Sequence, residues 1–356
     1  MRATWQRWHP TALVVALALA LGTFFYQTGR GDETERPSPA DDGVLRVYFT
    51  PQAGQTRSED AGGVQADLVA ALESASSSID IAVYDLDLPA VRDALIAAHR
   101  RGLRVRVVAE TDNLDQPALQ DLLAAGVPLV DDRRPSLMHH KFVVIDEQQV
   151  WTGSLNLTWN GLHRNDNHLL AIQSTDLAAD YLREFEEMFI DDRFGPLSLP
   201  DTPYPFLAIG EAAVEVGFSP DDGIEGRLLQ RLQDAESQIL VLAFVLTSDS
   251  IAEALLQAHE RGVEVRAVAE ARQSGGAGSD VDRLRAAGLD LRLDTNPANM
   301  HHKVIVIDRS TVIVGSYNFT QSAEHDNDEN SLMIDDPGLA AQFVDQFELI
   351  YQAAVP

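Results

Sequence analysis

Short apolar runs alternate with amphipathic segments along the chain, and the whole series occurs twice. The apolar runs predict buried strands, and apolar residues spaced three or four positions apart predict helices, one of which ends in each series at Gly102 or Gly262. The first series predicts strands at 45–49, 79–84, 104–109, 141–145 and 150–153; the second predicts them at 214–218, 239–245, 264–269, 303–307 and 312–315. Alternating strands and helices are typical of an α/β fold.

The two series are copies of one another. Residues 91–110 align with 251–270 at an offset of 160, and residues 138–146 align with 300–308 at an offset of 162. We therefore expect two homologous α/β halves that pack about a pseudo-twofold axis and share one active-site cleft. The predicted halves are 44–195 and 213–354, and a Pro-rich connector at 196–212 joins them.

The N-terminal 30 residues have the pattern of a membrane-targeting segment. Arg2 and Arg7 precede an apolar run at 11–26, which is short for a membrane span and long enough for a signal peptide. An uncleaved signal-anchor is the first interpretation and a cleaved signal peptide the second. Either one places the rest of the chain outside the cytoplasm, anchored to the membrane or secreted. The polar, Pro-rich residues 31–43 predict a flexible tether.

Composition narrows the possible chemistry. The 356 residues include 55 acidic and 27 basic side chains, so the net charge is −28, and cysteine is absent. The absence of cysteine excludes disulfides, thiolate zinc sites and cysteine nucleophiles. The acidity argues against a general nucleic-acid coat protein, but it is compatible with an enzyme whose cleft is locally basic. Only two of the basic residues are lysines, Lys141 and Lys303.

Both lysines lie in a repeated motif, His-x-Lys-x₄-Asp-x₆-Gly-Ser-x-Asn. The motif residues are His139, Lys141, Asp146, Gly153, Ser154 and Asn156 in the first half, and His301, Lys303, Asp308, Gly315, Ser316 and Asn318 in the second. Side chains alternate faces on a strand, so each histidine projects with its lysine, while His140 and His302 point away. Each pair of adjacent histidines is therefore a poor metal chelate. Imidazole, ammonium, hydroxyl and amide groups on one face form a site for a tetrahedral oxyanion. Two imidazoles on opposite sides of one phosphorus supply a nucleophile and an acid.

This motif resembles that of the phospholipase D superfamily, in which HxKxxxxD followed by GSxN occurs twice per site. The resemblance implies the phospholipase D-like fold and a phosphohistidine intermediate, with no metal or other cofactor in the chemistry. It implies that His139 and His301 are nucleophile and acid and that Lys141, Lys303, Asn156 and Asn318 hold phosphoryl oxygens. Ser154 and Ser316 would support this phosphate site. Asp146 and Asp308 match the motif aspartate, for which we expect a structural role as much as a catalytic one.

The two halves differ where the family commonly places a group that supports the catalytic imidazole. The second half offers Glu329, and the first offers Asn167 with Asp166 beside it. A carboxylate raises the pKa of an imidazole and favours its protonated form. The hypothesis from the sequence is therefore that His301 is the general acid and His139 the nucleophile. Glu110 and Glu270 end equivalent strands, where they either face the cleft or are solvated.

The sequence thus predicts a membrane-anchored, extracytoplasmic phosphodiesterase of phospholipase D type, with a phospholipid as the favoured substrate. The alternative is an endonuclease of the same superfamily. A phosphatidyltransferase and an inactive binding protein are weaker interpretations. No protein partner is evident.

Overall fold

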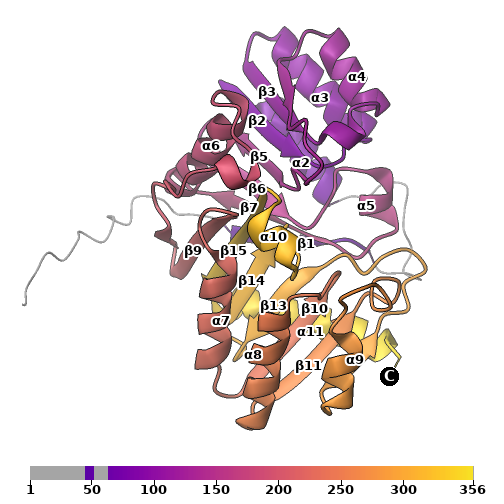
Figure 1. Ribbon diagram of the computed structural model, residues 1–356. Coiled ribbons are helices and arrows are strands. Elements are labelled where there is room, and N and C mark those ends of the chain that lie inside the picture. Colours follow the sequence, from indigo (N-terminus) through magenta and orange to yellow (C-terminus); the bar gives the residue numbers. More distant parts are fainter. Residues whose placement is uncertain (1–44, 52–62, 356) are drawn as a thin grey trace, which may run out of the picture. The chain divides into compact units, whose positions relative to one another are not determined.

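The computed structural model describes residues 45–51 and 63–355 (Figure 1). The predicted membrane-targeting segment at 1–30 and the tether at 31–43 lie outside these residues. Within the described part of the chain, no helix is both long and apolar enough to cross a membrane.

The first half is built on a seven-stranded sheet. Its strand order is β1-β7-β6-β5-β2-β3-β4. The strands are β1 Leu45–Phe49, β2 Ser78–Val83, β3 Arg104–Ala109, β4 Leu129–Asp131, β5 Lys141–Ile145, β6 Gln149–Gly153 and β7 His168–Gln173. β2, β3 and β4 run parallel, and β5, β6, β7 and β1 are antiparallel to their neighbours. The central strands are mostly apolar because helices or the second half cover both faces, and the buried Asp80 of β2 is paired with Arg104 and Arg106 of β3.

The second half repeats this sheet and adds one strand. Its strand order is β12-β11-β10-β13-β14-β15-β9-β8. The strands are β8 Phe206–Ile209, β9 Ala212–Ser219, β10 Gln238–Ala243, β11 Glu264–Ala269, β12 Asp290–Leu293, β13 Lys303–Ile307, β14 Thr311–Gly315 and β15 Glu329–Asp335. The additional strand β8 lies inside the segment expected to be a plain connector, 196–212, and it pairs with β9.

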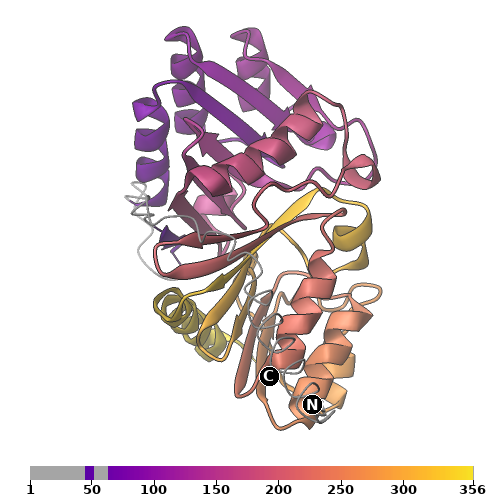
Figure 2. The same cartoon turned by 90° about the vertical axis from the view of Figure 1, so that its left-hand side faces the viewer.

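Helices separate the buried residues into three clusters. The helices are α2 Val64–Ser74, α3 Pro89–Arg100, α4 Pro117–Ala124, α5 Trp159–His163, α6 Thr175–Phe189, α7 Ile224–Asp234, α8 Asp249–Glu260, α9 Val281–Ala286, α10 Gln321–His325 and α11 Pro337–Ala353. Helices α2, α3 and α4 cover the outer face of the first sheet, and α7, α8 and α9 cover that of the second. Helix α6 crosses the opposite face of the first sheet (Figure 2). Together α6, α11 and the inner faces of both sheets form one shared core.

This shared core fixes the two halves against each other. Residues from both sheets, such as Phe142 and Phe218, pack around Tyr181 of α6 at ring-centroid distances of 5.0 and 5.1 Å. Burial of an aromatic side chain stabilises a fold by about 1.5–3 kcal/mol, and paired rings add to this. The pairing of the halves is therefore part of the hydrophobic core, and side chains from both can form one rigid site.

Candidate active site

The segments that enter β5 and β13 cross between the two halves. The backbone N–H of His139 donates to the carbonyl of Asp328 at 2.9 Å, and that of His301 donates to the carbonyl of Asp166, also at 2.9 Å. Isolated bridges pair Met138 with Asp328 and Met300 with Asp166. This reciprocal exchange places the first histidine of each motif against the strand of the other half.

The two motif histidines and lysines are buried at this junction. His139 and His301 are 5% and 6% exposed, and Lys141 and Lys303 are 3% and 2% exposed. The structure thus brings the four residues that the motif predicts into one site.

Each lysine is held in the same way. Lys141 Nζ donates to the carbonyl of His139 at 2.7 Å, and Lys303 Nζ donates to that of His301 at 2.9 Å. Burial lowers the pKa of Lys141 to about 7 and lowers that of Lys303 as well. An ammonium group has three donors, so each lysine keeps donors for a phosphoryl oxygen. A bound anion restores the charge that burial disfavours.

An aromatic ring lies beside each lysine and histidine, and the sequence pattern alone did not single it out. The Tyr84 ring centroid is 5.0 Å from Lys141 Nζ, and the Phe244 centroid is 4.5 Å from Lys303 Nζ. The same rings meet the imidazoles edge to face, at centroid distances of 5.0 Å for His139 and 4.5 Å for His301. Their repetition at an offset of 160 residues was the available signal. Face contact with a ring stabilises a partly desolvated ammonium.

Each motif imidazole is supported by a side chain from the other half. The sequence hypothesis assumed instead that Glu329 supports His301, the histidine of its own half, and the structure contradicts that assumption. His139 Nδ1 lies 2.9 Å from Glu329 Oε2, and His301 Nδ1 lies 2.9 Å from Asn167 Oδ1. The carboxylate therefore supports the histidine of the other half, because the crossing segments place each β-strand terminus beside the opposite motif. Asp166 does not take this role, since Asn167 does.

The supporting groups are themselves fixed. Glu329 is fully buried and accepts hydrogen bonds from Asn327 Nδ2 at 3.2 Å and from the backbone N–H of Asn318 at 3.1 Å. Burial raises the pKa of Glu329 to about 7, and the neighbouring Lys141 opposes this rise. Burial and the two lysines lower the pKa values of His139 and His301. The free site therefore favours neutral imidazoles.

The serines and asparagines of the motif have separate tasks. Ser154 Oγ donates to Asn167 Oδ1 at 2.9 Å, and Ser316 Oγ accepts from the backbone N–H of Asn330 at 3.0 Å. Both serines are buried, and their hydroxyls bind the residues Asn167 and Asn330 at the start of β7 and β15, so they support the site. Asn156 Oδ1 and Asn318 Oδ1 are buried without a hydrogen-bond partner in the described part of the chain. Phosphoryl oxygens accept hydrogen bonds, so the Nδ2 donors of these two amides are the groups that would bind a substrate phosphate.

Asp146 and Asp308 are not in the site, which corrects their inclusion among the candidate catalytic residues. Each follows the far end of its strand, about 16 Å along β5 or β13 from the lysine. Asp146 accepts hydrogen bonds from the backbone N–H groups of Ser76, Ser77 and Ser78 at 2.7–3.1 Å. Asp308 binds residues 236–238 in the same way. Their role is to fix the turn before β2 and β10.

The second histidine of each motif faces away from the site, as the strand alternation predicts. His140 Nε2 lies 2.8 Å from Glu184 Oε1 on α6, and His302 Nδ1 lies 3.0 Å from His168 Nδ1. Glu110 and Glu270 are buried, and they accept the backbone N–H groups of Met138 and Met300 at 2.8 and 2.7 Å. These carboxylates position the motif strands and are not solvated strand ends.

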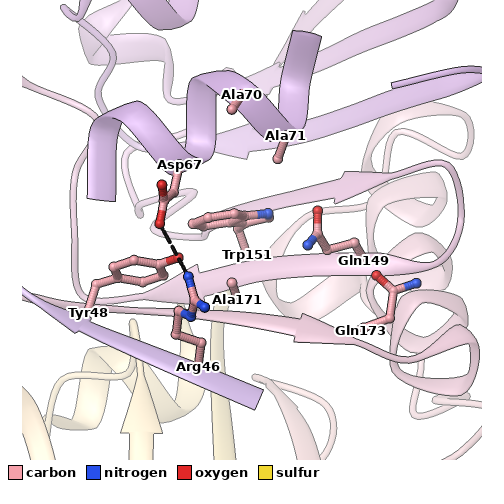
Figure 3. A pocket seen from close by; sticks show the side chains of 9 residues that line it. All are labelled: Arg46, Tyr48, Asp67, Ala70, Ala71, Gln149, Trp151, Ala171 and Gln173. Atoms are coloured by element: carbon pink, nitrogen blue, oxygen red, sulfur yellow. Dashed lines mark hydrogen bonds and ion pairs between the residues drawn. The ribbon is translucent and has the colours of Figure 1, made fainter. Parts of the chain in front are cut away.

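Two further features concern a possible metal site and a pocket outside the repeated motif. Within residues 45–51 and 63–355, no group of three or more His, Cys, Asp or Glu side chains is arranged to hold a metal ion. A pocket of about 360 Å³ opens on the first half, between α2 and the strands β1, β6 and β7 (Figure 3). Its lining includes Arg46, Tyr48, Asp67 and Trp151, and it contains no residue of the repeated motif.

Known proteins similar to this chain carry phospholipase D or cardiolipin names. A family model described as "Cardiolipin synthase, PLD-like domain" matches the chain twice, at residues 68–189 and 228–351. The mitochondrial cardiolipin hydrolase of Chlamydomonas reinhardtii is 37% identical over 125 residues, which cover 35% of this chain and 56% of that protein. The phospholipase D of Rickettsia typhi is 35% identical over 150 residues, which cover 41% of this chain and 74% of that protein.

A solved structure extends the likeness to both halves. The phosphatidylserine synthase of Haemophilus influenzae superposes with a TM-score of 0.64 and covers 82% of this chain and 84% of its own. Its sequence identity is 13%, so it bears on the fold alone.

Proposed function

The chain belongs to the phospholipase D superfamily, and on this premise we propose that it hydrolyses a phosphodiester bond through a covalent phosphohistidine. One observation carries the proposal: imidazoles from opposite halves lie in one buried site with a lysine beside each. Neither half contains a complete site, because each imidazole depends on a supporting side chain from the other.

In the first step, Nε2 of His139 attacks phosphorus while the bond from phosphorus to one ester oxygen breaks. Nε2 of His301 gives its proton to the departing oxygen. Lys141 and Lys303 bind the non-bridging oxygens, where negative charge accumulates in the transition state. The anionic substrate offsets the charge of the lysines, which otherwise lowers the pKa of His301, and so allows this imidazole to hold a proton.

In the second step, Nε2 of His301 takes a proton from water. The water oxygen attacks phosphorus and the bond between phosphorus and His139 breaks, which releases the phosphate monoester and returns the imidazole. The two histidines thus exchange acid and base roles between the steps, as microscopic reversibility requires.

We assign the nucleophile to His139 for a reason that differs from the sequence argument. Glu329 Oε2 lies 2.9 Å from Nδ1 of His139, a contact that favours the tautomer with the proton on Nδ1 and the lone pair on Nε2. The carboxylate also stabilises the positive charge that the ring acquires when it bonds to phosphorus. In contrast, Nδ1 of His301 lies beside two neutral acceptors, the Asn167 amide oxygen at 2.9 Å and the Ser154 carbonyl at 3.1 Å.

An aryl phosphodiester tests this assignment, because p-nitrophenolate departs without protonation. A His301→Ala variant should release one equivalent of p-nitrophenolate in a burst and then stop, since its phosphoenzyme cannot activate water. A His139→Ala variant should give no burst. A burst from the His139 variant and none from the His301 variant would reverse the roles.

A phospholipid is the proposed substrate. Two observations support this class: the relatives are named cardiolipin hydrolase and phospholipase D, and the N-terminal sequence is typical of a membrane-targeting segment. The deciding assay compares phospholipid vesicles with single- and double-stranded DNA at one enzyme concentration. Turnover of DNA and of no lipid would make the chain a nuclease, and release of a transphosphatidylation product with added alcohol would show transferase activity.

We also propose that the enzyme works at an extracytoplasmic membrane surface, held by residues 1–30. The support is the order of Arg2 and Arg7 followed by the apolar run at 11–26. Fractionation of cells and N-terminal sequencing of the recovered chain distinguish an intact anchor from a cleaved signal peptide. Recovery of the intact chain in the cytoplasm would contradict both.

A further inference from the structure

The loops that border the site have the same backbone in both halves but differ in one charge. The loop after β2 reads Tyr84-Asp85-Leu86-Asp87, and the loop after β10 reads Phe244-Val245-Leu246-Thr247. Leu86 forms a bridge with Leu157 and Leu246 forms one with Phe319, each directly after a motif asparagine. Asp85 therefore stands beside Asn156 where Val245 stands beside Asn318.

The environment of Asp85 is unfavourable for an ionised carboxylate. Its Oδ1 atom is buried and has no hydrogen-bond partner in the described part of the chain. Burial raises the pKa of Asp85 and Asp87 raises it further, while a hydrogen bond from the backbone N–H of Leu86 and the charge of Lys141 oppose this rise. Val245 occupies the equivalent position with the same backbone, so the fold does not need a carboxylate there. A partly desolvated carboxylate that the second half replaces by Val suggests a role towards the substrate.

Charge on the next loop reinforces this difference. The Tyr84 phenol lies near Asp85 and Asp112, and Arg272 replaces Asp112 in the second half. The first half therefore presents an aromatic ring with carboxylates next to the phosphate site, and the second half presents none of these acids. An ammonium group is stabilised by carboxylates and by aromatic rings, whereas a second phosphate beside these acids is repelled.

We propose that Asp85 binds the cationic end of the substrate, which makes the preferred substrate a phospholipid with an aminoalcohol headgroup. The inference rests on the proposed phospholipid function. The phosphate occupies the site between Lys141 and Lys303, and the ammonium, two carbons beyond an ester oxygen, lies on the Asp85 side. The two ester arms of the diester are thereby distinguished. Anionic lipids with a second phosphate or a neutral headgroup lack this contact.

The test compares kcat/KM for phosphatidylcholine and phosphatidylglycerol with identical acyl chains in the same mixed micelles. Asp85→Asn retains the side-chain shape, and Asp85→Val copies the residue that the second half already accommodates at this position. Both should lower the phosphatidylcholine-to-phosphatidylglycerol ratio about tenfold or more, which corresponds to about 1.4 kcal/mol. The quaternary ammonium of choline has no N–H to donate, so it is the negative charge of Asp85 that these variants remove from the contact. The exposed Asp115→Asn removes the same charge from the same half and should leave the ratio unchanged. Glycerophosphocholine, a diester with the same headgroup and no acyl chains, shows whether the headgroup alone is recognised.

The possible results distinguish a failure of headgroup recognition by Asp85 from a failure of the proposed phospholipase function. An equal loss with both lipids would mean that Asp85 acts only through Lys141, and an unchanged ratio would mean that it contacts no headgroup; either result overturns the inference and leaves the phospholipase function standing. A wild-type protein that hydrolyses neither lipid overturns the phospholipid function, and the inference with it.

Discussion

Substitution of Glu329 by Gln tests the cross-half support of the nucleophile. The amide oxygen of Gln can still accept the Nδ1–H of His139 across the 2.9 Å contact, but the negative charge is lost. Shape is conserved, so the change isolates the electrostatic contribution of the carboxylate.

The magnitude follows from the geometry. The centres of the imidazolium and carboxylate charges lie about 4 Å apart, which corresponds to roughly 4 kcal/mol at an effective dielectric constant near 20. This charge develops only as His139 bonds to phosphorus, so its stabilisation acts on the transition state and not on the bound substrate. A loss of that size lowers kcat by about 10³, and the retained hydrogen bond reduces the loss towards about 10². KM should change little.

The assay is the pre-steady-state burst with the aryl phosphodiester, which reports formation of the phosphoenzyme directly. The burst rate should fall with kcat in Glu329→Gln. Asn167→Asp is the matched variant, because it places the same charge beside His301 instead and should leave the burst within a few fold of wild type. Melting curves confirm that both variants are folded. A Glu329→Gln burst within a few fold of wild type would refute the cross-half argument, as would a defect confined to KM.

Three further outcomes are expected. His139→Ala and His301→Ala should each abolish steady-state turnover, and EDTA should not reduce the wild-type rate, since protein side chains supply the nucleophile, the acid and the anion site; loss of activity in EDTA would contradict this. Asp146→Asn should lower the free energy of unfolding by about 1–2 kcal/mol through the lost turn hydrogen bonds while kcat is kept, which denaturant titration and kinetics measure; a large fall in kcat would return this residue to the site. Burial raises the pKa of Asp221 to about 9 and that of Asp180 to about 7, so the folded state binds their protons more tightly than the unfolded chain does. The stability they contribute is present at low pH and is lost as pH rises towards 9; the melting temperature should be lower at pH 9 than at pH 6, and Asp221→Asn should flatten this slope.

The fold was largely predictable because the same pattern of apolar and amphipathic segments occurs twice in the sequence. An apolar run such as 79–84 is ambiguous alone, but its repetition at 239–245 between the same helices indicates α/β layering. The structure confirms the two homologous halves and the strands that carry the motif. Strands β7 and β15 and helices α6 and α11 were not among the expected elements. Helix α6 does carry the helical spacing, with Leu177, Tyr181, Phe185 and Met188 on its buried face, so its absence from the expected elements was an omission. What the spacing does not show is that this face packs against both halves.

The site was predictable to the extent that it depends on neighbours along the strand. The two-residue spacing of His139 and Lys141 places both in the site, and the adjacent His140 points away, as observed. The motif aspartate shows the limit of this reasoning. Asp146 belongs to the same sequence pattern as the lysine, but five residues of extended strand carry it to the opposite end of the sheet.

The sequence by itself determined which side chains form the site and that there are two sets of them, because a strand's period of two and a repeated motif are properties of the chain. Only the tertiary structure decided which supporting group meets which imidazole. The segments leading into β5 and β13 each bond to the strand of the other half, so Glu329 reaches His139 and Asn167 reaches His301. These contacts across a pseudo-twofold axis join residues 190 and 134 positions apart, and no spacing along the chain encodes them.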